Sequence, residues 1–281
     1  MFDPANRIAR IHQFVDQAKG ELPTMPEIVH KVLAESERPD SSPVSLERLI
    51  TTDAALTAKC LRIANSVYYG LPREVNSVSQ AVLIMGMRQV KNLVLSVAAI
   101  SLMTPRTPRQ RDYFLQFWKR SLGAACAAEW LAGNALMTAF DVDNSFIGGL
   151  LHDIGEMVLY SQLGEPYVQA LAAASAQGVS QSRLEFELLG FDHADLGAAL
   201  AVRWSLPDAI DLAIRLHEMP DTSDGVPGCV RRGVLCVQEA LAPSDDPAES
   251  ALGLEPECAE HLKEHVRERV AQAGALFGLL A

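Results

Sequence analysis

The segment FIGGLLHDIGEMVLY, residues 146–160, combines a helical pattern with a pair of polar side chains. Its apolar residues recur at helical spacing and predict one helix with Phe146, Leu150 and Ile154 on its buried face. His152 and Asp153 lie at the border of that face. An imidazole and a carboxylate placed there must pair with neighbours or bind an ion, because an unpaired buried charge is costly. The segment therefore predicts either a hydrogen-bonded His–Asp pair or a metal site.

The same helical periodicity runs through most of the chain, so we expect an all-α fold. Ser45, Asp53 and Asp192 are predicted N-caps, and Ser182 with Glu185 forms a capping-box pattern. The expected helices cover residues 2–19, 26–37, 45–50, 77–85, 113–132, 146–160, 165–176 and 227–241, with further helices starting near 53, 87, 182, 192 and 207 and one at the carboxy-terminal end.

Composition excludes several classes of protein. The 281 residues are 49% hydrophobic and carry a formal net charge of −11, so an extended surface for a phosphate backbone is not expected. The five cysteines contain no C-x-x-C pair, and no apolar stretch approaches the ~20 residues needed to span a membrane. There is also no amino-terminal apolar segment of a secretory signal. We therefore expect a cytoplasmic protein without a membrane partner.

The segment around residues 104–110, rich in Pro and Arg, interrupts the helical pattern and predicts a boundary between two helical halves. Residues 80–95 have the spacing of a helix-turn-helix, with Arg88 and Lys91 on the second helix. Two packed helices beside a solvated basic loop also explain this pattern, and we prefer that interpretation. Nucleic acid is thus an unlikely partner on sequence grounds.

Two further histidines bear on the His152–Asp153 pair. His193 falls in the first turn of the helix that Asp192 caps. His217 shares a helical face with Ile210 and Ile214 and therefore points inward. Each could be a core residue held by hydrogen bonds, but three histidines and several acids on neighbouring helices favour a ligand role modestly.

Several blocks, in order, resemble the HDOD domain, the HD-related output domain of bacterial signalling proteins. They are LPTMPEIVHKVL (22–33), DAALTAKCLRIANSVYYG (53–70), SVSQAVLIMGMRQVKNLVL (77–95), GLLHDIGEMVL (149–159), ELLGFDHADLGAALAVRWSLPDAI (187–210) and AIRLHE (213–218). The resemblance implies an HD-like helical lobe packed on an amino-terminal helical lobe. We expect a helix within residues 1–21, an HDOD domain over 22–242 (lobes 22–104 and 110–242), and a linker with a final helix over 243–281.

The related HD phosphohydrolases bind metal through a first histidine, the His-Asp pair and a distant aspartate. The resemblance places Arg120 at the first of these positions and Glu239 at the last. A guanidinium has no lone pair to donate to a metal. The implied remnant site is thus His152, Asp153, His193, His217 and Glu239, and Arg120 is a candidate to fill it by pairing with Asp153.

The first functional interpretation is a non-catalytic regulatory domain of bacterial signal transduction that acts through protein–protein contacts and needs no cofactor. The alternative is a metal-dependent phosphohydrolase or cyclic-nucleotide phosphodiesterase that uses a divalent metal on the shifted ligand set. A second alternative is nucleic-acid binding through the helix-turn-helix-like pair. The oligomeric state stays open.

Overall fold

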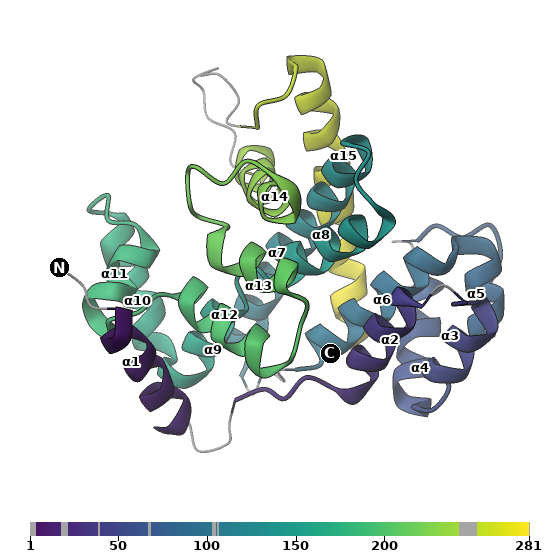
Figure 1. The fold of residues 1–281 in the computed structure, drawn as a ribbon, viewed down its shortest axis with the longest axis horizontal. Helices are drawn as coiled ribbons and strands as arrows, with labels where there is room; N and C mark the ends of the chain where they lie inside the picture. The colour runs from purple at the N-terminus through teal and green to yellow at the C-terminus, as the bar shows by residue number, and fades with distance from the viewer. Residues whose placement is uncertain are drawn as a thin grey trace.

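The computed structural model describes residues 4–17, 22–38, 40–66, 69–102, 105, 107–241 and 252–280. This part of the chain forms helices and no strand (Figure 1). The helices are α1 (Pro4–Gln17), α2 (Glu27–Glu37), α3 (Pro43–Ile50), α4 (Ala54–Ala64), α5 (Val78–Met85), α6 (Met87–Ile100), α7 (Pro108–Asn134), α8 (Ala139–Leu151), α9 (Ile154–Leu163), α10 (Glu165–Ser175), α11 (Gln181–Leu189), α12 (His193–Arg203), α13 (Asp208–Leu216), α14 (Gly225–Leu241) and α15 (Pro256–Leu280). The predicted all-α class is confirmed; the predicted linker at 243–251 lies outside the described residues.

The helix expected over residues 146–160 is in fact two helices, which is a correction to the sequence pattern. α8 ends at Leu151, and α9 begins at Ile154 after a turn at His152 and Asp153. The ring Nδ1 of His152 donates to the Gly149 carbonyl oxygen over 2.8 Å. This hydrogen bond satisfies one of the backbone carbonyl groups at the carboxyl end of α8. The turn therefore places both polar side chains at a helix junction rather than on a helix face.

Two predicted N-caps are displaced by a few residues. Ser42, not Ser45, caps α3, because Pro43 already supplies the fixed φ of a first helical residue; Ser45 is the N3 partner of the capping box. Ser180, not Ser182, caps α11. Asp53 and Asp192 cap α4 and α12 as predicted.

The helices form an elongated molecule (Figure 1). α2 to α6 lie at one end, α1 and α9 to α12 lie at the other, and α7, α8, α14 and α15 lie between them. α7 packs against α8 at short range, since a Cβ on Gly149 would lie 2.6 Å from the Ala125 Cα. The two glycines at 148–149 thus serve helix packing. No described helix has the length and apolar character to cross a membrane.

The hydrophobic core does not divide at the segment around residue 105. One cluster of buried residues continues from α2 to α6 into α7, α8, α9, α12 and α13. A second cluster is built mainly from α7, α14 and α15. At the amino terminus, Phe14 of α1 packs edge-on against Phe191, with ring centroids 5.5 Å apart. The two expected lobes therefore share one continuous interior.

Candidate metal centre

Three segments bring the predicted site residues together. His152 and Asp153 form the α8–α9 turn, His193 is the first residue of α12, and His217 directly follows α13. All three histidines are buried, and Asp153 is nearly so, with a side chain 16% exposed. Close packing allows this approach: a Cβ on Gly155 would lie 2.0 Å from the His193 carbonyl oxygen. A side chain at residue 155 would therefore keep α9 away from α12.

Each imidazole is oriented by its Nδ1 atom. His152 Nδ1 lies 2.8 Å from the Gly149 carbonyl oxygen, and His217 Nδ1 lies 2.7 Å from that of Ile214. His193 Nδ1 lies 2.6 Å from Oε2 of Glu185. Carbonyl and carboxylate oxygens only accept, so we assign a proton to all three Nδ1 atoms. A neutral ring then has its lone pair on Nε2.

The Nε2 atoms converge on the Asp153 carboxylate. Oδ2 of Asp153 lies 3.1 Å from His152 Nε2; Oδ1 lies 3.1 Å from His217 Nε2 and 3.6 Å from His193 Nε2. The last two nitrogens are 3.3 Å apart. Lone pairs that face each other and a carboxylate repel unless a cation lies between them. Protons or one metal ion can supply that positive charge.

The ionisation of the cluster follows from these contacts. Burial by itself would raise the pKa of Asp153, but His152 and His217 hold that pKa well below its usual value. Burial lowers the pKa of His193, yet the hydrogen bond and charge of Glu185 outweigh it and raise this pKa to about 10. The pKa of His152 is also raised, because Asp153 outweighs the effect of burial. Without a metal, these shifts therefore favour protonated His152 and His193 rings beside an ionised Asp153.

The donor set fits a divalent metal ion. Asp153, His193 and His217 each offer one ligand atom, and these atoms lie within 4.8 Å of one another. His152 contacts the other oxygen of the same carboxylate. Imidazole nitrogens with one carboxylate suit Zn, Fe or Mn, and Nδ1–H groups bound to protein oxygens are the usual support for such ligands. Asp153, His193 and His217 are therefore the residues that could hold a divalent cation.

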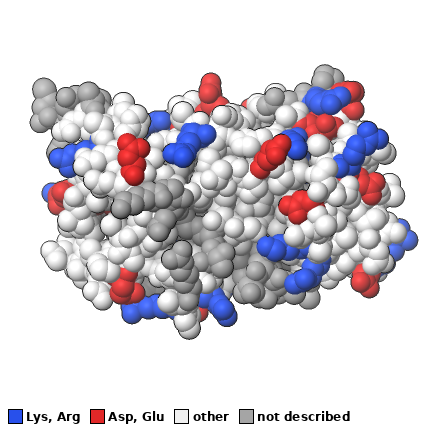
Figure 2. Space-filling model, turned by 90° about the horizontal axis from the view of Figure 1, so that it is seen from below, with Lys and Arg blue, Asp and Glu red and all other residues white. Residues whose placement is uncertain are grey.

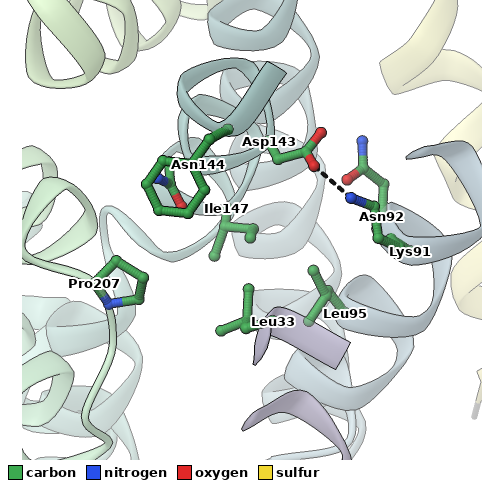
Figure 3. A pocket seen from close by; sticks show the side chains of 9 residues that line it. Leu33, Lys91, Asn92, Leu95, Asp143, Asn144, Ile147 and Pro207 are labelled. Carbon is green, nitrogen blue, oxygen red and sulfur yellow. Dashed lines mark hydrogen bonds and ion pairs between the residues drawn. The ribbon is translucent and has the colours of Figure 1, made fainter. Parts of the chain in front are cut away.

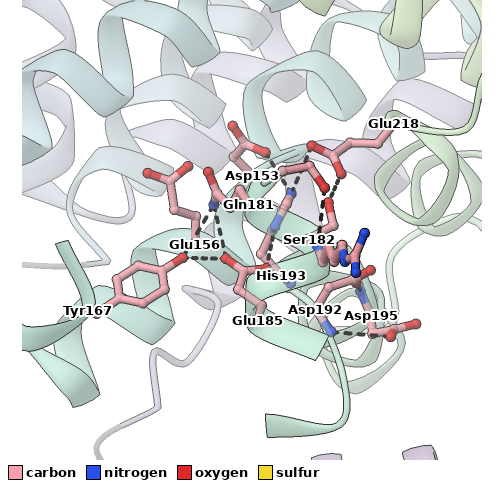
Figure 4. Close-up of polar contacts among 12 residues, drawn as sticks. Asp153, Glu156, Tyr167, Gln181, Ser182, Glu185, Asp192, His193, Asp195 and Glu218 are labelled. Carbon is pink, nitrogen blue, oxygen red and sulfur yellow. Dashed lines mark hydrogen bonds and ion pairs between the residues drawn. The ribbon is translucent and has the colours of Figure 1, made fainter. Parts of the chain in front are cut away.

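Glu185 is a site residue that the sequence pattern did not reveal. Its side chain is buried on α11; Oε2 accepts both the ring and the backbone N–H of His193, the latter at 2.7 Å (Figure 4). Tyr167 and Gln181 donate to the other oxygen. The sequence pattern predicts a capping-box acid at this position, because it lies three residues after Ser182. Only the tertiary contact between α11 and α12 assigns its role.

One side of the cluster reaches solvent through Glu218. Its side chain is 47% exposed, and Oε1 lies 3.8 Å from His193 Nε2. The hydroxyl of Ser182 donates to the same carboxylate (Figure 4). Glu218 thus covers the outer edge of the donor cluster and can add a negative charge to it.

The predicted Arg120–Asp153 pair is wrong. Nη2 of Arg120 lies 3.0 Å from Oε1 of Glu156, and Tyr113 donates to the same carboxylate oxygen. Glu156 lies one helical turn beyond the His-Asp pair and is 4% exposed, so it needs a counter-charge more than Asp153, which already faces three imidazoles. Arg120 therefore neutralises a neighbour of the site.

Glu239 does not join the cluster either, contrary to the shifted ligand set. It lies on α14, and Oε2 is 3.4 Å from Nζ of Lys263 on α15. The register of α14 against α15 thus pairs this side chain with Lys263. The remaining predicted ligands, His152, Asp153, His193 and His217, do come together.

The two basic residues of the helix-turn-helix-like pair both form ion pairs with one carboxylate of α8. Arg88 Nε lies 3.0 Å from Oδ1 of Asp143, and Lys91 donates to the other oxygen. Residues 90–99 of α6 are all buried, so this helix presents little side-chain surface. On the face seen in Figure 2, basic and acidic side chains are interspersed. These contacts favour two packed helices over a DNA-reading element.

Comparison with known proteins gives the family. Residues 22–220 match the model of the HDOD domain. The chain belongs to the HDOD domain family. An uncharacterized protein of Treponema pallidum (strain Nichols) is 28% identical over 197 residues, which are 70% of this chain. The chain spans about 37% of the length of that curated relative.

Solved structures share the fold of this HDOD protein. A “Putative phosphohydrolase” from Shewanella amazonensis SB2B superposes with a TM-score of 0.74 at 24% identity, covering 97% of this chain and 98% of that one. A “Putative signal transduction protein” from Marinobacter aquaeolei VT8 gives a TM-score of 0.77 at 22% identity, covering 98% of this chain and 66% of that one. At such identities the similarity establishes the fold alone.

Proposed function

We propose that this HDOD protein is a non-catalytic regulatory module of bacterial signal transduction, located in the cytoplasm, that acts through contacts with protein partners. The observation that carries the proposal is the enclosure of the donor cluster. The side chains of His152, His193 and His217 are at most 4% exposed, and Glu218 lies at the solvent edge, so a phosphate ester would have to displace Glu218 to reach their Nε2 atoms. Hydrolysis by a metal-bound water needs such access.

Arg120 supports the same conclusion. It replaces the first histidine expected from the HD phosphohydrolases, and its guanidinium is held by Glu156 rather than by a ligand residue. A metal at the cluster would thus be held by a different set of residues, centred on Asp153, His193 and His217. Its positive charge would neutralise the cluster and link the α8–α9 turn to α12 and α13.

The convergent donors also favour a second candidate, a metal-dependent phosphohydrolase. Asp153, His193 and His217 could hold an ion that activates water, with Glu218 at the solvent edge as a proton acceptor. This activity requires the outer edge, formed by Glu218 and Ser182, to open. The two candidates differ in whether the metal-loaded protein turns over a phosphate ester.

The test is turnover by protein loaded with Mn²⁺, Fe²⁺ or Zn²⁺, on a panel of phosphomonoesters, phosphodiesters and cyclic nucleotides. We expect no turnover above the His152→Ala variant. His12→Ala, a change at an exposed histidine of α1, is the matched control. Turnover that survives in His12→Ala and disappears in His152→Ala would establish the enzyme and reject the regulatory proposal.

A second experiment addresses regulation directly. In the source bacterium, the phenotype of deleting the gene should be restored by His152→Ala as well as by the native protein, provided that the variant folds. Circular dichroism of the purified variant checks folding. Restoration by the native protein alone, with a folded variant, would mean that the cluster itself carries the function.

A further inference from the structure

The hollow where α2 meets α8, lined by Leu33, Asn144 and Ile147, has room for about one water molecule (Figure 3). Nδ2 of Asn144 is buried and has no hydrogen-bond partner among the described residues, so a group the size of water fits its needs. No organic ligand fits beside it. This hollow therefore serves Asn144 and not a regulatory ligand.

α1 lies on the corner between α11 and α12, at one end of the molecule (Figure 1). We call this corner the α1 seat; it consists of Phe186, Leu189, Gly190, Phe191 and Asp195. The seat lies within the part of the chain that matches the HDOD family, whereas α1 precedes that match, which begins at residue 22. A helix from outside the match thus covers a surface of the family domain.

Three side chains on one face of α1 make the contact. Arg7, Ile11 and Phe14 are spaced i, i+4 and i+7, so they project from the same side of the helix. Nη1 of Arg7 lies 3.0 Å from Oδ1 of Asp195, and its guanidinium carbon lies 5.1 Å from the centre of the Phe186 ring. Ile11 is 6% exposed, and the Phe14 ring packs edge-on against the seat. An arginine followed by two apolar residues is thus the pattern that the seat accommodates.

The charge of the seat explains why a cation is needed there. Asp195 is 8% exposed, and a carboxylate so deeply placed requires a positive partner. Its Oδ2 accepts from the backbone N–H of Asp192, while Oδ1 faces the arginine. A guanidinium can pair with this oxygen and lie over the Phe186 ring at the same time. The seat therefore complements an arginine together with apolar side chains.

α1 makes a shallow contact with its seat. Among residues 6–17, whose side chains the structure describes, Ile11 alone is buried. Arg7 is 40% exposed, so solvent screens its ion pair with Asp195. A helix that buries so little apolar surface is held by a small part of the stability of the fold. We therefore expect α1 to leave the seat by local opening.

We propose that the α1 seat is a docking site for an amphipathic helix of a partner protein, one that presents an arginine and, four and seven residues later, two apolar side chains. α1 is the built-in competitor of that helix. Asp195 is the third residue of α12, whose first residue is His193, so a partner that replaces α1 acts on the helix end that carries a donor of the cluster. This inference rests on the proposed regulatory function, because it names the class of protein partner.

The test measures binding of a fluorescein-labelled peptide with the sequence of residues 4–17 to the full chain, by fluorescence anisotropy. The native protein should bind this peptide weakly, because its own α1 competes at high effective concentration. Ile11→Ala loosens α1 and should tighten binding about tenfold. Ile8→Ala makes the same change at a side chain that is 55% exposed, and it should bind like the native protein. Equal affinity of the two variants, or no saturable binding to either, would overturn the proposal.

A second peptide tests recognition of a partner. It is an alanine-rich helix that carries only an arginine, an isoleucine and a phenylalanine at the spacing of Arg7, Ile11 and Phe14. It should bind the Ile11→Ala protein with an affinity close to that of the first peptide. Replacing its arginine by glutamate should weaken binding about tenfold or more, since a carboxylate would then face Asp195. Binding of the first peptide alone would mean that the seat accepts only this chain's own helix, against the partner class proposed.

Hydrogen exchange of the native full chain gives a readout that needs no variant. Amides of α1 should exchange faster than those of α12, because α1 opens locally. Equal protection of the two helices would show that α1 leaves only when the whole fold opens, which contradicts the proposal. Turnover of a phosphate ester would reject the regulatory function without changing peptide binding. Failed peptide binding in a protein without turnover would reject the docking site alone.

Discussion

One carboxylate oxygen of Glu185 accepts two hydrogen bonds from His193, one from the ring at 2.6 Å and one from the backbone at 2.7 Å. This pairing fixes both the ring orientation and its tautomer, so Nε2 faces Asp153 and His217. The acid also draws α11 onto the start of α12. Glu185 is thus a positioning residue for the donor cluster.

Glu185→Gln should weaken metal binding about 10- to 100-fold, the usual effect of removing such a supporting group. The amide keeps the size of the side chain but loses the negative charge that favours a proton on Nδ1. Isothermal titration with Zn²⁺ measures the change. Glu187→Gln, at an exposed position of the same helix, is the control and should bind like the native protein. Equal affinity in both variants would contradict the role assigned to Glu185.

Gly155→Ala should destabilise the fold by about 3 kcal/mol, because the new methyl would collide with the His193 backbone in a rigid helix contact. Gly133→Ala is the matched change: its Cβ would meet nothing within 4 Å inside helical backbone, so we expect a gain of about 0.5–1 kcal/mol. Urea unfolding curves measure both. A Gly155→Ala variant as stable as native would mean that α9 and α12 are not in close contact.

Arg120→Met should cost about 2 kcal/mol, since it leaves the buried Glu156 carboxylate without its counter-charge; the partial exposure of Arg120 moderates the loss. The double variant Arg120→Met, Glu156→Gln should recover most of that stability. Thermal unfolding of the four proteins gives the coupling. If the two changes simply add, the ion pair does not act as described.

At pH 8, iodoacetamide should modify Cys258 well before the other four cysteines. Burial raises the pKa of Cys60 and of Cys236 to about 12, so at this pH both remain thiols, which are poor nucleophiles. Cys126 and Cys229 are buried as well, whereas Cys258 is half-buried on α15. Peptide mass spectrometry of the native and the urea-unfolded protein checks this order. Early labelling of Cys60 would show that α4 opens easily.

The double variant Arg88→Ala, Lys91→Ala should lower the stability of the fold without abolishing any salt-dependent DNA binding. Both side chains already form ion pairs with Asp143, so they are not available to phosphate groups. Fluorescence anisotropy with duplex DNA at low salt and thermal unfolding provide the two readouts. The exposed pair Lys31→Ala, Arg48→Ala keeps the same total charge as the double variant and is its control. Binding lost in the first variant and kept in the control would reverse our interpretation of α6.

Sequence reasoning predicted the fold class, most helices, and the meeting of His152, Asp153, His193 and His217. These predictions rest on helical periodicity, on helix caps and on the ordered family blocks. The partners of Arg120, Glu185 and Glu239 could not be predicted, because they depend on the register between helices far apart in sequence. The end of α8 at Leu151 could not be predicted either, because the apolar pattern continues unchanged across the turn. The hydrogen bond of a single side chain, His152, stabilises that turn.

The extent of the family match has a practical bearing on how this protein can be divided. The HDOD match ends at residue 220, yet most residues of the second core cluster come from α14 and α15, which follow it. Gly123 of α7 lets Val237 and Val270 approach directly. A fragment cut at residue 220 would leave a long apolar face of α7 uncovered, so it should aggregate. Transplanting this module into another protein therefore requires the chain to continue through α15.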